Sequence, residues 1–130
     1  MGSQPTVLVI EDNPQNMKLV KALLSLRELE GRYASTAADG LAMAKESAPG
    51  VILLDIQLPD GDGITVLQTL RADPRTAGVP VIAVTASAMR GDRERFLDEG
   101  FDGYLAKPID ARTFVDSVLE TAERARLARS

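Results

Sequence analysis

Five short apolar runs alternate with longer amphipathic segments along this chain of 130 residues. Continuous apolar runs of four or five residues are typical of strands that are covered on both faces. Strict alternation of such strands with helices predicts a parallel sheet, because parallel neighbours need a crossover connection. The second run is more polar than the others and predicts an edge strand. The five runs are residues 7–10, 32–36, 51–54, 81–84 and 103–106.

The segments between the runs carry apolar residues at helical spacing. The fourth segment has the weakest helical pattern because it contains Gly91, which disfavours a helix by about 1 kcal/mol relative to alanine. Its apolar face depends on Met89, Phe96 and Leu97, and we expect Met89 and Phe96 to lie in the core. The first predicted helix follows the cap Asn13-Pro14, the second follows the pair Asp39-Gly40, and the third follows the turn at 60–63. The fourth spans residues 88–99, and the fifth follows the cap Asp110.

These elements predict an α/β fold of the doubly wound, (βα)5 type. We expect a five-stranded parallel sheet in the order 2-1-3-4-5 within a three-layer α/β/α sandwich, the flavodoxin-like arrangement. Residues 6–123 would form this single domain. Residues 1–5 are typical of an N-terminal tail left by an expression tag, and residues 124–130 would be the end of the last helix or a tail. In such folds, ligands bind outside the carboxyl ends of the strands, where the strand order reverses.

Composition excludes several kinds of chemistry. The chain has no cysteine and no histidine, which excludes disulfides, a thiolate nucleophile and an imidazole base. A bound metal would therefore be a hard, oxygen-ligated ion. The formal net charge of −4 argues against direct binding of nucleic acid, and the apolar runs are too short to span a membrane. A soluble, cytoplasmic protein is expected.

Reactive side chains follow four of the five apolar runs. Glu11 and Asp12 follow the first run and Asp55 the third, so in the predicted strand order these three carboxylates converge at the switch point. Like charges 4 Å apart repel by about 4 kcal/mol at an effective dielectric constant near 20. The cluster therefore needs a cation or a retained proton, and a few carboxylates in an open cavity suit Mg²⁺.

The fourth and fifth runs end in Thr85 and Lys107. A cation, an ammonium group and a hydroxyl around one carboxylate are typical of a phosphoryl-transfer site. Asp55 is the best candidate for the nucleophile because it follows the most apolar run, and carboxylates can accept phosphoryl groups. Ala86 has a small side chain, which leaves its backbone N–H free to reach a phosphoryl group.

From Thr6 to Glu123, the sequence resembles a response-regulator receiver domain of bacterial two-component signalling. Within that family, its pattern is similar to stand-alone cell-division regulators and to receivers of hybrid kinases. Each motif is modest alone, but the set in this order and at these spacings is specific. The motifs are Val7-Leu8-Val9-Ile10-Glu11-Asp12-Asn13, Leu54-Asp55-Ile56-Gln57-Leu58-Pro59, Val84-Thr85-Ala86 and Leu105-Ala106-Lys107-Pro108.

The resemblance implies a signalling switch and not a turnover enzyme. Asp55 would accept a phosphoryl group from a histidine kinase or a His-containing phosphotransfer protein, and Thr85, Ala86 and Lys107 would contact that group. The resemblance also implies a cis bond between Lys107 and Pro108. The implied ligands of Mg²⁺, or of Mn²⁺ in its place, are Glu11, Asp12, Asp55 and the backbone carbonyl of Gln57.

Phosphorylation would then change the surface formed by the fourth helix, the fifth strand and the fifth helix, where a downstream protein target binds. Thr85 would move toward the phosphoryl group and Tyr104 would swing inward. We expect a monomer or a weak, phosphorylation-dependent dimer.

Two other classes of function remain open at this point. One is a Mg²⁺-dependent phosphohydrolase with an aspartate nucleophile, although such enzymes usually carry a second acid where this chain has Gln57. The other is a flavodoxin-like FMN carrier, although the loop after the first run is acidic. The stretch Asp60-Gly61-Asp62-Gly63 lacks the later ligands of a calcium loop and predicts a turn into the third helix, with its acids near the metal site.

Overall fold

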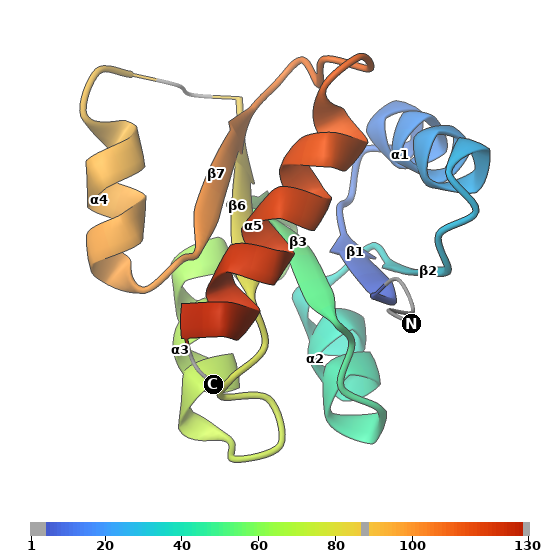
Figure 1. Cartoon of the computed structure of the whole chain (residues 1–130). Helices are drawn as coiled ribbons and strands as arrows, with labels where there is room; N and C mark the ends of the chain where they lie inside the picture. Colours follow the sequence, from blue (N-terminus) through green and yellow to red (C-terminus); the bar gives the residue numbers. More distant parts are fainter. Residues whose placement is uncertain (1–4, 87–88, 129–130) are drawn as a thin grey trace.

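A computed structural model describes residues 5–86 and 89–128 and shows a five-stranded parallel sheet with helices on both faces (Figure 1). The strands pair in the order β2-β1-β3-β6-β7, which confirms the predicted order 2-1-3-4-5. The labels differ because a small antiparallel hairpin, β4 and β5, lies between β3 and α3. The elements are β1 (Val7–Ile10), α1 (Pro14–Leu26), β2 (Gly31–Ala34), α2 (Ala37–Glu46), β3 (Val51–Asp55), β4 (Gln57–Leu58), β5 (Gly61–Asp62), α3 (Gly63–Ala72), β6 (Val81–Thr85), α4 (Asp92–Glu99), β7 (Gly103–Ala106) and α5 (Phe114–Ala128).

The register of the strands brings their carboxyl ends to one edge of the sheet. Ile10 of β1 lies opposite Leu54 of β3, so the residues that follow them, Glu11 and Asp55, come to the same level. On the other side of β3, Thr85 of β6 lies opposite Ala106 of β7. Because the strands are parallel, side chains far apart in the sequence meet at this edge.

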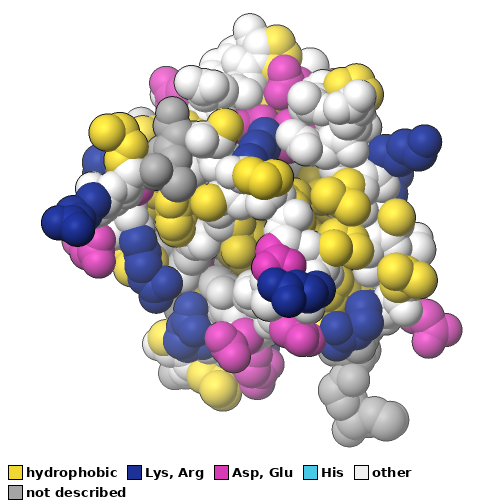
Figure 2. All heavy atoms as spheres, turned by 90° about the horizontal axis from the view of Figure 1, so that it is seen from above, with side chains coloured by type: hydrophobic (Ala, Val, Ile, Leu, Met, Phe, Trp, Pro, Cys, Tyr) yellow, Lys and Arg dark blue, Asp and Glu magenta, His cyan; other side chains and the backbone are white. Residues whose placement is uncertain are grey.

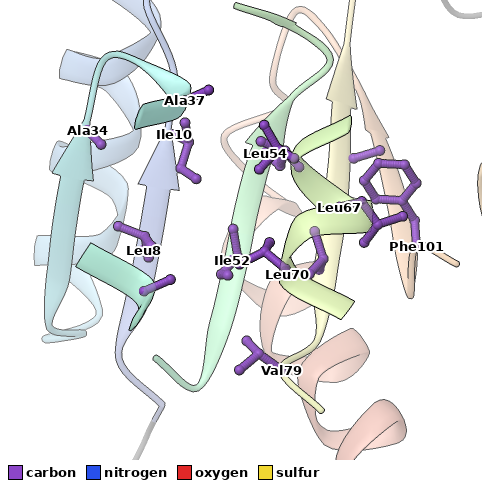
Figure 3. Close-up of a cluster of buried hydrophobic side chains, with 14 of the residues drawn as sticks. Leu8, Ile10, Ala34, Ala37, Ile52, Leu54, Leu67, Leu70, Val79 and Phe101 are labelled. Atoms are coloured by element: carbon purple, nitrogen blue, oxygen red, sulfur yellow. The ribbon is translucent and has the colours of Figure 1, made fainter. Parts of the chain in front are cut away.

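Two apolar clusters fill the space between the sheet and the helices. One lies between the sheet and the helices α1 and α5, and includes Leu24 and Phe114. The other lies under α2, α3 and α4, and Figure 3 shows side chains of α2 and α3 pointing toward those of the strands. Both faces of the central strands β1, β3 and β6 are therefore buried, as their continuous apolar runs predicted.

Helix α2 begins earlier than the sequence predicted. The Thr36 hydroxyl accepts a hydrogen bond from the backbone N–H of Asp39 at 3.1 Å, so the helix is capped there and contains Asp39 and Gly40. Gly40 faces the sheet, where a Cβ atom would lie only 2.4 Å from Cδ1 of Ile10. The glycine is thus a packing position, because it lets α2 lie against β1, and the prediction that it precedes the helix was wrong.

Helix α4 begins later than predicted, at Asp92. Gly91 has a φ of +89° and forms the N-cap, a backbone conformation that favours glycine. Phe96 is buried, but Met89 precedes the helix and is 73% exposed, so the prediction of Met89 in the core was wrong. Residues 87–88, at the predicted start of this helix, lie outside the described residues.

Helix α5 begins at Phe114 and continues to Ala128, the last described residue. It is preceded by a short turn in which the Asp110 carboxylate accepts a hydrogen bond from the backbone N–H of Arg112 at 3.0 Å. The expected end of the last helix at 124–130 is seen as helix as far as Ala128, and residues 1–4 of the expected tail lie outside the described residues. Among the described helices, each is too short or too polar to cross a membrane.

Candidate functional site

Three acidic side chains meet at the carboxyl end of the sheet, where the strand order reverses between β1 and β3. Glu11 and Asp55 are buried, with 4% and 5% of their surface exposed, whereas Asp12 is exposed. One carboxylate oxygen from each of the three lies within 4.8 Å of the other two. The predicted convergence of these carboxylates is therefore what the structure shows.

Lys107 lies between the two buried acids. Its Nζ atom is 3.0 Å from Oε1 of Glu11 and 3.0 Å from Oδ2 of Asp55. The position of this ammonium group follows from the register, since Lys107 comes directly after Ala106 at the end of β7. The Lys107–Pro108 bond is cis, as the resemblance implied.

Backbone N–H groups fix the remaining carboxylate oxygens. The N–H of Gln57 donates to Oδ1 of Asp55 at 3.0 Å, and the N–H of Asn13 donates to Oε2 of Glu11 at 3.0 Å. The Asn13 side chain also caps α1 by accepting hydrogen bonds from the N–H groups of Gln15 and Asn16. The sequence predicted Asn13 as a helix cap but gave no signal of its contact with Glu11, because that contact depends on the path of the loop.

Burial and neighbouring charge change the protonation of this cluster. Burial raises the pKa of Glu11, and the hydrogen bond and negative charge of Asp55 raise it further. Burial alone would lower the pKa of Lys107, but its hydrogen bonds to Glu11 and Asp55 outweigh this and raise the pKa. The lysine therefore stays charged, and the pair of buried acids favours a bound cation or a retained proton.

The site opens into a cleft of about 520 Å³ at this edge. Figure 2 views the same edge from above and shows acidic side chains beside basic ones in the upper middle of the face. Glu11 contacts Lys107 and is not among the residues that line the cleft, but all the other residues predicted for the phosphoryl and metal sites are. The lining residues are Asp12, Asn13, Pro14, Asp55, Gln57, Leu58, Pro59, Thr85, Ala86 and Lys107.

The acids of the turn at 60–63 have a different role from the predicted one. The Asp60 carboxylate accepts hydrogen bonds from the first N–H groups of α2, and the Asp62 carboxylate accepts one from Thr65 at the start of α3. Neither belongs to the acidic cluster. Asp62 nevertheless pairs with Gln57 in the β4–β5 hairpin, so the turn lies beside the cleft while its two carboxylates cap helices.

Tyr104 lies on β7, the strand that ends directly before Lys107. Its side chain is half-buried and its ring stacks on that of Phe96, with 5.6 Å between the ring centroids and 28° between the planes. The ring therefore contacts α4, the helix that follows Thr85 and Ala86 in the chain.

The donor set at this site fits a divalent cation of the Mg²⁺ type. The three carboxylates of Glu11, Asp12 and Asp55 offer only oxygen ligands, and Gln57 lines the cleft beside them. Three carboxylates face one ammonium group, so a divalent ion balances the charge when all three are ionised. An exposed Asp12 at the mouth of the cleft leaves room for water ligands, which Mg²⁺ retains.

Comparison with known proteins agrees with this arrangement. Residues 7–119 match the response regulator receiver domain family. The chain is 39% identical over 113 residues to the polar-differentiation response regulator DivK of Brucella ovis, covering 87% of this chain and 92% of that protein. This chain therefore belongs to the response regulator receiver domain family, whose members are phosphorylatable signalling switches and not turnover enzymes.

Solved structures show the same fold. The receiver domain of the sensor histidine kinase PA1611 from Pseudomonas aeruginosa is 30% identical to this chain, with a TM-score of 0.82. The match covers 93% of this chain and 99% of that domain. That structure holds a magnesium ion in its active-site cleft. A CheY-like receiver domain protein from Methanospirillum hungatei is 26% identical, with a TM-score of 0.84 and coverage of 97% and 99%. Family membership sets aside the phosphohydrolase and the FMN carrier.

Proposed function

We propose that Asp55 is the phosphoryl acceptor of this receiver domain. A carboxylate oxygen of Asp55 attacks the phosphorus of a phosphohistidine, a new O–P bond forms as the N–P bond breaks, and the electron pair returns to the imidazole of the donor. The product is an acyl phosphate on Asp55. The observation that carries this assignment is the position of Asp55, which is buried at the base of the cleft and contacts Lys107.

The other residues of the cleft have separate roles in this proposal. Glu11, Asp12, Asp55 and the Gln57 carbonyl would hold Mg²⁺ or Mn²⁺, and the ion supplies positive charge near the transferred oxygens. Lys107 is already placed 3.0 Å from Asp55 and would pair with a phosphoryl oxygen. The Thr85 hydroxyl and the Ala86 backbone N–H, both beside the cleft, would donate hydrogen bonds to the same group.

Receiver domains interact with histidine kinases and with downstream targets. For this chain, the proposed donor is a histidine kinase or a His-containing phosphotransfer protein in the cytoplasm. The proposed output is a protein target that binds the surface of α4, β7 and α5, without direct contact to nucleic acid or membrane. The domain, residues 6–123, would act as a monomer or as a weak dimer formed on phosphorylation.

Incubation with acetyl phosphate tests the proposed chemistry without the cognate kinase. In Mg²⁺ the intact mass should rise by one phosphoryl group, and in EDTA this adduct should be absent, because the acidic cluster then repels the incoming group. Mn²⁺ should restore the adduct. An adduct that forms equally in EDTA would show that transfer does not use a metal at this site.

The position of the Tyr104 ring shows whether phosphorylation of Asp55 changes the surface at α4. We expect beryllofluoride, a mimic of the bound phosphoryl group, to draw Thr85 toward Asp55 and to move the Tyr104 ring inward from its place against Phe96. Nuclear Overhauser contacts between the two rings, which are 5.6 Å apart, should weaken on addition of beryllofluoride and Mg²⁺. Unchanged ring contacts and an unchanged Tyr104 rotamer would remove Tyr104 from the switch.

A further inference from the structure

One carboxylate joins the hairpin after Asp55 to the start of helix α2. Asp60 lies in the turn of the β4–β5 hairpin, and its two oxygens accept hydrogen bonds from the backbone N–H groups of Ala37 at 2.8 Å and Ala38 at 3.0 Å. These are the first two residues of α2, more than twenty positions away in the sequence. Helix caps usually come from the helix's own N-terminal flank, and α2 already has such a cap in Thr36. The contact of Asp60 is therefore an additional, long-range tie.

Helix α2 also packs against β1, the strand that ends directly before Glu11 and Asp12. Gly40 of α2 lies so close to Ile10 that a Cβ atom there would be 2.4 Å from the isoleucine side chain, and Ile10 directly precedes Glu11. Figure 3 shows Ala37, at the start of α2, beside Ile10. The N–H of Glu11 also donates to the carbonyl of Ala34, which ends the strand before α2. The start of α2 is thus held against the end of β1.

The hairpin carries another of the proposed metal ligands. Gln57 is the first residue of β4, and its N–H holds Asp55 while its carbonyl is a proposed ligand of Mg²⁺. The hairpin has only two residues in each strand, and both residues of β5 are exposed. So short a pairing needs a further anchor to keep one conformation, and Asp60 supplies one.

We propose that Asp60 is a positioning residue for the metal site: by binding the start of α2, it holds the Gln57 carbonyl in register with Glu11 and Asp12, which follow β1. This inference rests on the proposed Mg²⁺ site. It has a reciprocal consequence, because coupling between two sites works in both directions. Mg²⁺ that engages Gln57 restrains the hairpin, which in turn keeps Asp60 on the N–H groups of Ala37 and Ala38.

Titration of Mg²⁺ by calorimetry, together with amide hydrogen exchange, tests this coupling. In the wild-type protein, Mg²⁺ should slow exchange of the Ala37 and Ala38 amides. In Asp60→Ala, the affinity for Mg²⁺ should fall by about threefold to tenfold, somewhat less than is typical when a partner of a metal ligand is removed. The exchange of the two amides should then no longer respond to Mg²⁺. Asp60→Asn keeps one of the two acceptor oxygens and should give an intermediate affinity.

Thr36→Val is the matched control, because it removes the local cap of α2 and leaves Asp60 in place. Its melting temperature should fall as that of Asp60→Ala does, but its Mg²⁺ affinity should equal that of the wild type. If Asp60→Ala lowers the melting temperature yet binds Mg²⁺ as the wild type does, Asp60 is a helix cap only and the proposal is overturned. If the wild-type protein itself binds no Mg²⁺, the proposed metal site fails, and this inference fails with it.

Discussion

Replacing Lys107 by methionine is expected to lower the free energy of unfolding by about 3 kcal/mol in EDTA, because removing one partner of a buried ion pair leaves uncompensated charge. Lys107 contacts Glu11 and Asp55 at 3.0 Å each, and all three side chains are at least 85% buried. Methionine fills a similar volume without the positive charge. Urea unfolding followed by circular dichroism measures the change.

Magnesium should offset much of this loss, because the ion replaces the missing positive charge beside the two acids. The variant should also fail to form a phosphoryl adduct with acetyl phosphate. Lys18→Met is the control, since Lys18 is exposed on α1 and its loss should change stability by no more than about 0.5 kcal/mol. Equal stabilities of the two variants in EDTA would contradict the view of Lys107 as the counter-charge of the cluster.

Asp12→Asn should separate metal binding from stability. Asp12 is exposed, so its substitution should change the free energy of unfolding by no more than about 0.5 kcal/mol. Its carboxylate is nonetheless a proposed ligand, and its loss should weaken Mg²⁺ binding at least about tenfold, the effect typical of losing even a partner of a metal ligand. Calorimetric titration measures the affinity.

Asp98→Asn provides the control for the change in net charge, because Asp98 is an exposed acid on α4 away from the cleft. Its Mg²⁺ affinity should match that of the wild type. If both variants lose affinity equally, the effect arises from the overall field of an acidic protein and Asp12 is not a ligand.

Much of the fold was predictable from the sequence because the apolar runs are continuous. The runs at 51–54 and 81–84 match β3 and β6, whose residues are all buried. Their alternation with helices then determines the parallel sheet and its edge. The residues of the site were predictable for the same reason, since parallel strands bring the ends of distant runs together.

The boundaries of two helices were not predictable, because both depend on glycine. Gly40 lies inside α2 and Gly91 caps α4, although each resembles a residue that interrupts a helix. Gly40 lies within its helix because it packs against Ile10, and Gly91 ends the loop before α4 because it adopts a positive φ. Local propensity contains neither piece of information.

The long-range contacts of the loops could not be predicted from the sequence either. Asp60 and Asp62 are separated by one residue, yet one caps α2 and the other caps α3. The sequence predicted a turn near the metal site at these residues, but which helix each carboxylate caps depends on the path of the β4–β5 hairpin. The contact of the Asn13 backbone with Glu11 follows from loop geometry in the same way.

Locating the phosphoryl group on the chain tests the assignment of Asp55 most directly. After incubation with acetyl phosphate and Mg²⁺, the acyl phosphate can be reduced with borohydride and the modified residue identified by proteolysis and mass spectrometry. We predict modification of wild-type protein at Asp55 alone and none in Asp55→Asn, with circular dichroism confirming that the variant is folded. Modification at Asp12 or Glu11 in the wild type, or an adduct of equal yield in Asp55→Asn, would contradict the assignment.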